Sequence, residues 1–162
     1  MNIEFFSRWA HWNGRGELEG LKFPGVYALA ISNHNLSGKQ FSWIEQIVYI
    51  GMSNAVAGLK GRLKQFDNTI IGKIGHGGAE RFRHDYQSYE KLVPLLYVAV
   101  APFECKVTSN APADLLIMGN VAKAEYECWS QFVTIFKRLP KYNDKKNAPK
   151  FSKLPSVQTS YR

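Results

Sequence analysis

The sequence predicts a single α+β domain built on a small, mostly antiparallel sheet of three strands that is flanked by helices. Two short apolar stretches, GVYALAIS at residues 25–32 and QIVYIG at residues 46–51, are rich in β-branched and aromatic residues and indicate strands. A third apolar run at residues 92–101 indicates another strand, and helical spacing of apolar residues prevails elsewhere. A chain of 162 residues falls within the size range of one domain, so we expect one core.

The first two strands should form an antiparallel hairpin, because the linker NHNLSGKQFSWIE contains the Asn, Ser and Gly residues typical of turns. Residues 55–66 follow with apolar side chains at helical spacing. They predict a helix, although each glycine within it costs about 1 kcal/mol relative to alanine. Residues 67–85 are polar and rich in glycine, which favours a functional or mobile loop.

A second helical region should begin at Asn110, whose side chain can cap a first turn that contains Pro112. Helical periodicity then continues to about Leu139, with an expected break at residues 119–120, and Pro140 ends it. The opening twenty residues predict no more than a short helix followed by a loop. The expected order is therefore two strands, a helix, a strand and one or two long helices.

Positive charge is concentrated at the C-terminal end of the chain. The formal net charge is +8, yet residues 1–136 are nearly neutral, and residues 137–162 carry eight Lys and Arg against Asp144 alone. Clustered cations suit the phosphate backbone of DNA, because binding releases counterions; the alternative is a solvated segment that only aids solubility. We therefore divide the chain into an N-terminal extension (1–24), a central domain (25–143) and a basic C-terminal tail (144–162).

Composition argues against several other classes of protein. No stretch approaches the roughly 20 apolar residues that a membrane span needs, so we expect no membrane partner. The N-terminal segment lacks the apolar core of an export signal, so we expect a cytoplasmic protein. Thiols stay reduced in that compartment, and we interpret Cys105 and Cys128 as buried, inert thiols.

Two tripeptides, Gly25-Val26-Tyr27 and Tyr49-Ile50-Gly51, place one tyrosine in each strand of the expected hairpin. Neighbouring strands lie about 5 Å apart, so the two hydroxyl groups can converge on one small site. A strand tyrosine taken alone is usually a packing residue. Three further residues then follow in order along the chain: Arg62, Glu125 and Asn143.

This order resembles the GIY-YIG nuclease superfamily over about residues 25–143. The resemblance implies a DNA endonuclease that uses one metal ion, Mg²⁺ or Mn²⁺, and it leaves open whether the chain acts as a monomer or a homodimer. It implies that Tyr27 is the general base or orients the attacking water, with support from Tyr49, and that Arg62 neutralises phosphoryl charge. Glu125 would hold the metal ion. The residues with structural roles would be Gly25, Gly51 and Asn143.

The chain departs from the superfamily pattern at two points. Tyr27 and Tyr49 are 22 residues apart, about twice the separation in minimal members, so the hairpin connection should carry an insertion. Many members have a histidine four residues after the arginine, where this chain has Phe66. His76 or His84 in the expected loop could supply the missing imidazole and relay a proton.

Helical geometry selects Glu125 rather than Glu127 as the metal ligand, because Glu125 shares a helix face with apolar residues such as Val121 and Phe132. A carboxylate on an otherwise apolar face is costly unless it is paired, hydrogen-bonded or metal-bound. The alternative for Glu125 is a buried salt bridge. Glu127 should be an exposed surface charge.

Five basic residues outside the C-terminal tail could contact the DNA backbone: Lys60, Lys64, Lys73, Arg81 and Arg83. For Lys60 and Lys64, a plain role as surface cations on a helix is the favoured interpretation. Two other functions also remain open. One is a nucleic-acid-binding module that does not cleave, which the missing histidine after Arg62 favours; the other is a basic structural protein in which the tyrosines only pack.

Overall fold

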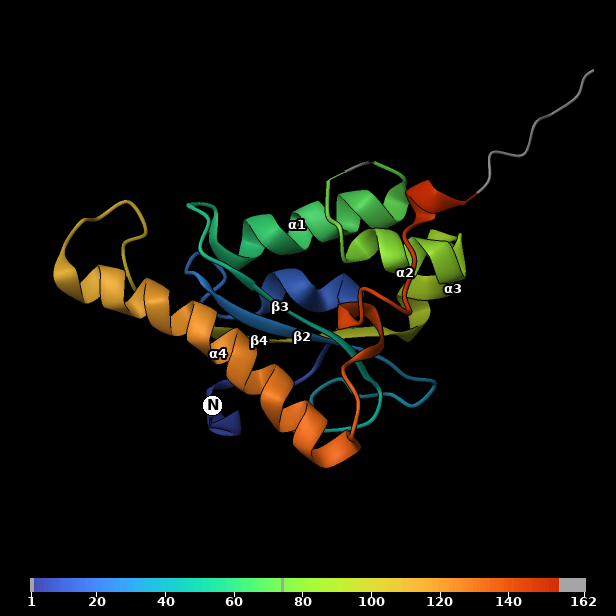
Figure 1. Ribbon diagram of the computed structural model, residues 1–162, viewed down its shortest axis with the longest axis horizontal. Helices are drawn as coiled ribbons and strands as arrows, with labels where there is room; N and C mark the ends of the chain where they lie inside the picture. The colour runs from blue at the N-terminus through green and yellow to red at the C-terminus, as the bar shows by residue number, and fades with distance from the viewer. Residues whose placement is uncertain (1, 74, 155–162) are drawn as a thin grey trace, which may run out of the picture.

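The structure is a computed structural model that describes residues 2–73 and 75–154. Its centre is an antiparallel sheet of four strands in the order β1-β4-β2-β3, with helices on both faces (Figure 1). The α+β class and the antiparallel hairpin of β2 and β3 are confirmed, whereas the expectation of three strands is wrong because a short N-terminal strand adds a fourth. The strands span Ala10–His11 (β1), Gly25–Ile31 (β2), Ile47–Ser53 (β3) and Leu96–Pro102 (β4).

Strand β2 lies between two apolar cores, because successive side chains of a strand point to opposite faces of the sheet. Tyr27 and Leu29 belong to one core, and Val26, Ala28 and Ala30 belong to the other. Helix α4 covers the second face, while α1 and α2 lie over the first (Figure 1). The three helices span Gly58–Ile71 (α1), Ala79–Tyr86 (α2) and Pro112–Phe136 (α4).

The N-terminal segment is part of the domain and contributes to both cores. Phe6 and Trp9 are buried on the α4 side, and Trp12 is buried on the α1 side, where its Nε1 donates a hydrogen bond to Asp67 Oδ1 at 2.7 Å. Strand β1 has two residues and is too short to show a periodic pattern in the sequence. The aromatic residues were therefore the sequence feature that could indicate burial of this segment. The short 3-10 helices of this segment span Ile3–Phe5 (η1) and Trp12–Glu17 (η2).

The expected loop of residues 67–85 is largely helical, which corrects the sequence prediction. Helix α1 continues to Ile71, and α2 occupies residues 79–86, so that the connection covers residues 72–78. Helix α2 buries Ala79 and Phe82 in the core beside α1, at a spacing typical of a helix. The glycines that favoured a loop are confined to this connection.

Strand β4 begins later than the apolar run that predicted it. Residues Tyr89–Leu92 form the short helix α3, and Val93–Leu95 form a 3-10 turn, η3. Pro94 lies in that turn, and a proline lacks the backbone N–H that a central strand needs. The ladder with β2 therefore starts at Leu96.

Helix α4 is continuous, so the expected break at residues 119–120 is absent. One glycine inside a helix costs about 1 kcal/mol, and burial of Val121 and Phe132 against the sheet offsets that cost. Asn110 does not cap the helix, which begins at Pro112 after Ala111 without a side-chain cap.

The residues after α4 return to the sheet edge and then pack on α2. They include two 3-10 helices, Lys141–Asn143 (η4) and Phe151–Lys153 (η5). Ser152 Oγ donates a hydrogen bond to Glu80 Oε2 at 2.9 Å, and the Arg83 guanidinium lies 4.0 Å from the centre of the Phe151 ring. The expected basic tail is therefore packed on the domain over residues 144–154; residues 155–162 lie outside the described residues.

The structure bears on two further expectations, that both cysteines are buried and that no segment spans a membrane. Cys128 is buried as expected, whereas Cys105 is partly exposed, in a loop after β4, and corrects the interpretation that both are buried. Within the described residues, none of the helices has the length and apolar character needed to cross a bilayer.

Candidate active site

An open cavity of about 550 Å³ lies beside β3, where α1, α2, α4 and the C-terminal segment meet. Its walls bring together residues that are far apart in the sequence but were singled out for catalysis, DNA binding or structure: Tyr49, Arg62, His76, Arg81, Glu125 and Asn143. Tyr27 does not line the cavity. The arrangement therefore gathers six of the predicted site residues from separate segments of the chain.

Tyr49 faces the cavity, and Tyr27 lies behind it. The two ring centroids are 6.0 Å apart, and Tyr27 is paired across the hairpin with Gly51. A Cβ atom on Gly51 would lie 2.6 Å from the Tyr27 hydroxyl and 2.8 Å from the Tyr49 ring, so glycine is required there. A Cβ on Gly25 would collide with the backbone of Ala101, so the structural role expected of both glycines has a steric cause.

The two tyrosines differ in their access to a substrate. Tyr27 has no exposed surface, whereas Tyr49 is half-buried and lines the cavity. Burial raises the pKa of Tyr27 well above its usual value of 10, and burial also raises the pKa of Tyr49, where the charge of Arg62 opposes the shift. The Tyr27 hydroxyl therefore lies behind the wall of the cavity, and the water-activating role that the resemblance implied for it stays a prediction.

His76 lies in the segment between α1 and α2 and forms a hydrogen bond with the buried Tyr27. Its Nδ1 accepts hydrogen bonds from the backbone N–H groups of Gly78 and Ala79, each at 3.1 Å. Because Nδ1 must then be unprotonated, Nε2 carries the hydrogen of the neutral ring and donates it to the Tyr27 hydroxyl oxygen at 2.9 Å. His76 in this tautomer cannot accept the proton of Tyr27, so a relay through its Nε2 is not available.

Burial, together with the charge of Arg62, lowers the pKa of His76 from 6.5 to about 3. The ring is 2% exposed, and it lies at the positive N-terminal end of α2, which also disfavours a charged imidazolium. His84, the other candidate imidazole, contacts Asp85 at 3.0 Å outside the cavity. His76 is therefore the histidine that belongs to the site, as a fixed hydrogen-bond donor.

The stability of the fold should decrease below pH 6.5 because of His76. The unfolded chain binds a proton there near pH 6.5 and the folded chain only near pH 3, so the free energy of unfolding should fall by up to about 1.4 kcal/mol per pH unit across that window. In His76→Gln, whose amide can still donate to Tyr27 but does not titrate, this part of the slope should vanish. Urea unfolding at pH 6.5, 5.5 and 4.5 measures how the free energy of unfolding depends on pH in the unmodified protein and in His76→Gln. Equal slopes in the two proteins would contradict a neutral His76 ring in the folded state.

Arg62 and Glu125 contribute opposite charges to the cavity. Arg62 lies on α1, and its Nη1 donates to Gln65 Oε1 at 2.9 Å, while its Nε is buried and has no partner among the described residues. Glu125 lies in the middle of α4, and burial raises the pKa of its carboxyl group against the opposing charges of Arg62 and Lys145. The positions of both side chains agree with the helical spacing in the sequence. Glu127 points away and pairs with Lys123 at 3.5 Å.

The Glu125 carboxylate fits a loosely held divalent cation better than a metal cage. Within the part of the chain that the structure describes, no three His, Cys, Asp or Glu side chains gather to bind a metal. The expected alternative, a salt bridge to Glu125, is also absent from those residues. One carboxylate, with water and phosphate oxygens completing the shell, is a donor set typical of Mg²⁺.

Asn143 joins the segment after α4 to the edge strand β3 through two hydrogen bonds. Its Oδ1 accepts from the backbone N–H of Ile50 at 2.8 Å, and its Nδ2 donates to the Ile50 carbonyl at 2.8 Å. The Trp129 indole also donates to that carbonyl at 3.3 Å. Asn143 therefore satisfies the exposed backbone of β3 beside Tyr49, which agrees with the structural role expected for it.

Replacing Asn143 with alanine should lower the free energy of unfolding by about 1–3 kcal/mol, because the Ile50 N–H then loses its partner. Asn147→Ala is the matched control. Its amide bonds to Asp144 in an exposed turn, and its loss should change stability by about 0.5 kcal/mol or less. Urea unfolding of both variants measures the two losses of stability. Similar losses would contradict a structural role of Asn143 at the backbone of Ile50.

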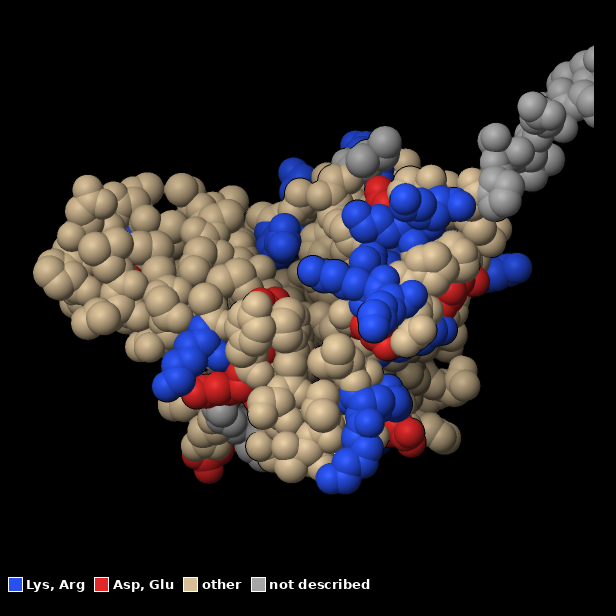
Figure 2. Space-filling model, viewed as in Figure 1, with Lys and Arg blue, Asp and Glu red and all other residues tan. Residues whose placement is uncertain are grey.

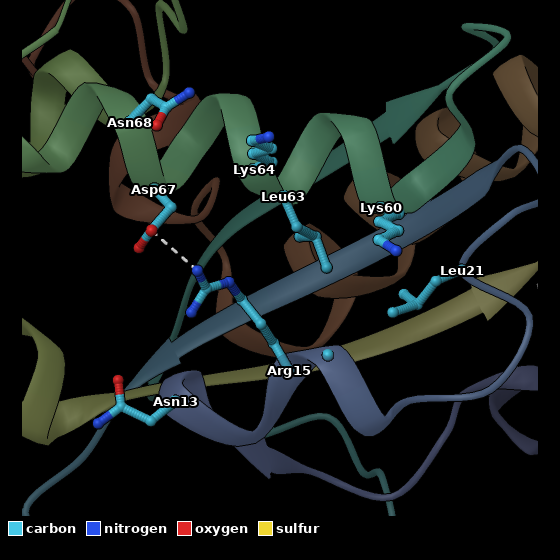
Figure 3. A pocket seen from close by; sticks show the side chains of 9 residues that line it. Asn13, Arg15, Leu21, Lys60, Leu63, Lys64, Asp67 and Asn68 are labelled. Atoms are coloured by element: carbon cyan, nitrogen blue, oxygen red, sulfur yellow. Dashed lines mark ion pairs between the residues drawn. The ribbon is translucent and has the colours of Figure 1, made fainter.

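The other basic residues expected to contact DNA are dispersed. Lys60 and Lys64 line a different hollow, of about 400 Å³, between α1 and the N-terminal segment, where Arg15 pairs with Asp67 at 2.8 Å (Figure 3). Lys73 is exposed outside the cavity. Arg83 stacks on Phe151 and does not line the cavity, so among these candidates Arg81 alone does so.

Two cations of the site, Lys145 and Lys150, were not identified individually from the sequence. They belong to the basic C-terminal region, and the charge excess there was the signal. Their exact placement depends on how the chain returns from α4 to α2, which local spacing does not encode.

The cavity thus combines a tyrosine hydroxyl, a carboxylate and several fixed cations, a set suited to an anionic substrate such as a phosphodiester. Comparisons of the chain with protein-family models, with curated proteins and with solved structures find no significant match. Function is therefore inferred from the residues of the cavity.

Proposed function

We propose that the protein is a metal-dependent DNA endonuclease that hydrolyses phosphodiester bonds, with a fold of the GIY-YIG type. The observation that supports this most is the convergence of Tyr49, Arg62, His76 and Glu125, from separate elements, on one open cavity. A structural protein in which the tyrosines only pack would have no reason to keep a carboxylate and a guanidinium in the same cavity beside them.

The chemistry assigns a different task to each side chain. Arg62 lines the cavity and stabilises the charge that develops on the phosphoryl oxygens. Tyr49 orients the attacking water and takes its proton; burial raises the pKa of its hydroxyl, and the positive charge of Arg62 opposes that rise. Tyr27 and His76 form a hydrogen-bonded pair behind Tyr49 that fixes its surroundings.

Glu125 would hold the divalent cation, Mg²⁺ or Mn²⁺, at the cavity wall. Such an ion polarises the scissile phosphate and stabilises the departing oxygen. The position four residues after Arg62 is filled by Phe66, whose ring lies 5.1 Å from the His76 ring. The imidazole of His76 therefore lies beside Phe66, although His76 follows α1 in the sequence rather than lying on it.

The distribution of charge suits a nucleic acid as the substrate. Figure 2 shows Lys and Arg side chains gathered over α2 and the C-terminal segment, whereas the projecting N-terminal end of α4 carries few on this face. Such a patch beside the cavity can bind the DNA backbone without reading the base sequence.

A binding module that does not cleave is the second candidate, and the single carboxylate in the cavity favours it. Supercoiled plasmid incubated with the protein in Mg²⁺ or in EDTA separates the two functions. The nuclease yields nicked or linear DNA in Mg²⁺ alone. A binding module retards the plasmid on a gel and leaves it intact, and a plasmid that is neither cut nor retarded would exclude both.

A further inference from the structure

Arg81 is a buried cation without an ion-pair partner in the part of the chain that the structure describes. It is 8% exposed and lies on α2, and its Nη1 donates to the Gly77 carbonyl at 3.2 Å. Its Nε is buried without a hydrogen-bond partner, and no ion pair reaches it from the residues that the structure describes. A guanidinium in this position leaves part of its hydrogen-bonding capacity unused at a high desolvation cost.

The rest of the cavity has the same imbalance of charge. Arg62 also keeps an unpartnered Nε, and Lys145 and Lys150 line the same cavity. Glu125 is the acidic residue that lines the cavity, so four formal positive charges face one negative charge. A single phosphate bound between Arg62 and a metal ion at Glu125 would leave Arg81 and Lys150 without a partner.

Lys150 is held next to Arg81 by the C-terminal segment. The Lys150 amine would lie 3.5 Å from a Cβ atom on Gly77, the residue whose carbonyl Arg81 contacts. The hydrogen bond of Ser152 to Glu80 attaches the following turn to α2. The two cations are thus fixed on the same side of the cavity by different segments of the chain.

We propose that Arg81 and Lys150 form a second phosphate-binding position, which takes the backbone phosphate next to the one that is cleaved. Arg81 supplies a rigid fork that is complementary to phosphate oxygens, and Lys150 supplies a compact positive charge. Phosphate binding at Arg81 does not depend on cleavage, whereas the identity of its source as a neighbouring backbone phosphate rests on the proposed function. A guanidinium with a purely structural role would instead be expected to have all its donors bonded.

The first test measures thermal stability in EDTA, with and without inorganic phosphate, at constant ionic strength set with chloride. Arg81→Met removes the charge and keeps the bulk, so without phosphate its Tm should equal or exceed that of the unmodified protein. Phosphate at about a hundredfold excess over Kd should raise the Tm of the unmodified protein by about 5–10 °C. Arg81→Met should lose most of that rise. Arg8→Met, which removes an exposed arginine bonded to Gly38, should keep it.

The second test identifies the source of the phosphate by calorimetry in EDTA. A trinucleotide with two phosphodiesters should bind the unmodified protein about tenfold more tightly than a dinucleotide with one, because it fills both positions. Arg81→Met should bind the two ligands equally. If phosphate binds through Arg81 but the trinucleotide has no advantage, the neighbouring-phosphate assignment is overturned.

The proposal as a whole is overturned if Arg81→Met keeps the phosphate response, or if it is less stable than the unmodified protein without phosphate. Neither test requires DNA cleavage or a bound metal ion. An intact plasmid in Mg²⁺, together with a phosphate response that depends on Arg81, would therefore reject the nuclease and retain the anion site.

Discussion

Tyr49→Phe should lower the rate of plasmid cleavage by about 10²- to 10⁴-fold, the range expected when a positioned acid–base group is removed. The phenylalanine ring keeps the contacts of Tyr49 with Phe66 and Phe82, so the fold should persist. Because burial raises the pKa of the Tyr49 hydroxyl above 10, the fraction of phenolate, and with it the rate, should increase from pH 7 to pH 9. Single-turnover cleavage across that range measures both effects.

Two further tyrosine variants make this prediction specific. Tyr97→Phe, in the core on the α4 side of the sheet, is the control and should leave the rate unchanged. Tyr27→Phe should reduce the rate less than Tyr49→Phe, because the Tyr27 hydroxyl is fully buried and acts through its neighbours. A greater loss in Tyr27→Phe than in Tyr49→Phe would return the water-activating role to Tyr27.

Arg62→Met should reduce cleavage by about 10²- to 10³-fold, the usual effect of removing one donor that stabilises transition-state charge. The loss should appear in the single-turnover rate at saturating protein, because the proposed contact strengthens as charge develops on the phosphate. Lys91→Met removes one positive charge from α3, away from the cavity, and should have no effect on the rate. An equal loss in both variants would indicate general charge attraction rather than a contact in the site.

Local patterns in the sequence predict the parts of the fold that depend on spacing within one element. The hairpin of β2 and β3 follows from two apolar runs joined by turn residues. Helix α2 was missed because the nearby glycines outweighed the burial pattern of Ala79 and Phe82. The continuity of α4 through Gly119 depends on its packing against the sheet, which no local propensity describes.

The candidate site was predictable to the extent that one ordered set of residues resembles a known superfamily. Sequence order indicated Tyr49, Arg62 and Glu125, and helical geometry predicted that Glu125 lies on an inward face of its helix and Glu127 on the surface, as the structure has them. The burial of Tyr27 and the tautomer of His76 depend on contacts between β2, α1 and the N-terminus of α2. Such contacts join segments distant in the sequence, so they could not be read from spacing.

The most direct test of the nuclease is the metal dependence of cleavage in two variants of α4. Glu125→Gln keeps the shape of the side chain and removes the charge in the cavity, whereas Glu127→Gln removes the same charge two residues away, outside it. Single-turnover cleavage of supercoiled plasmid is measured against the concentration of Mg²⁺ and of Mn²⁺. We predict that Glu127→Gln cleaves like the unmodified protein and that Glu125→Gln does not cleave detectably. Metal-dependent cleavage by Glu125→Gln at an unchanged rate and metal affinity would contradict the assignment of the cavity as the active site.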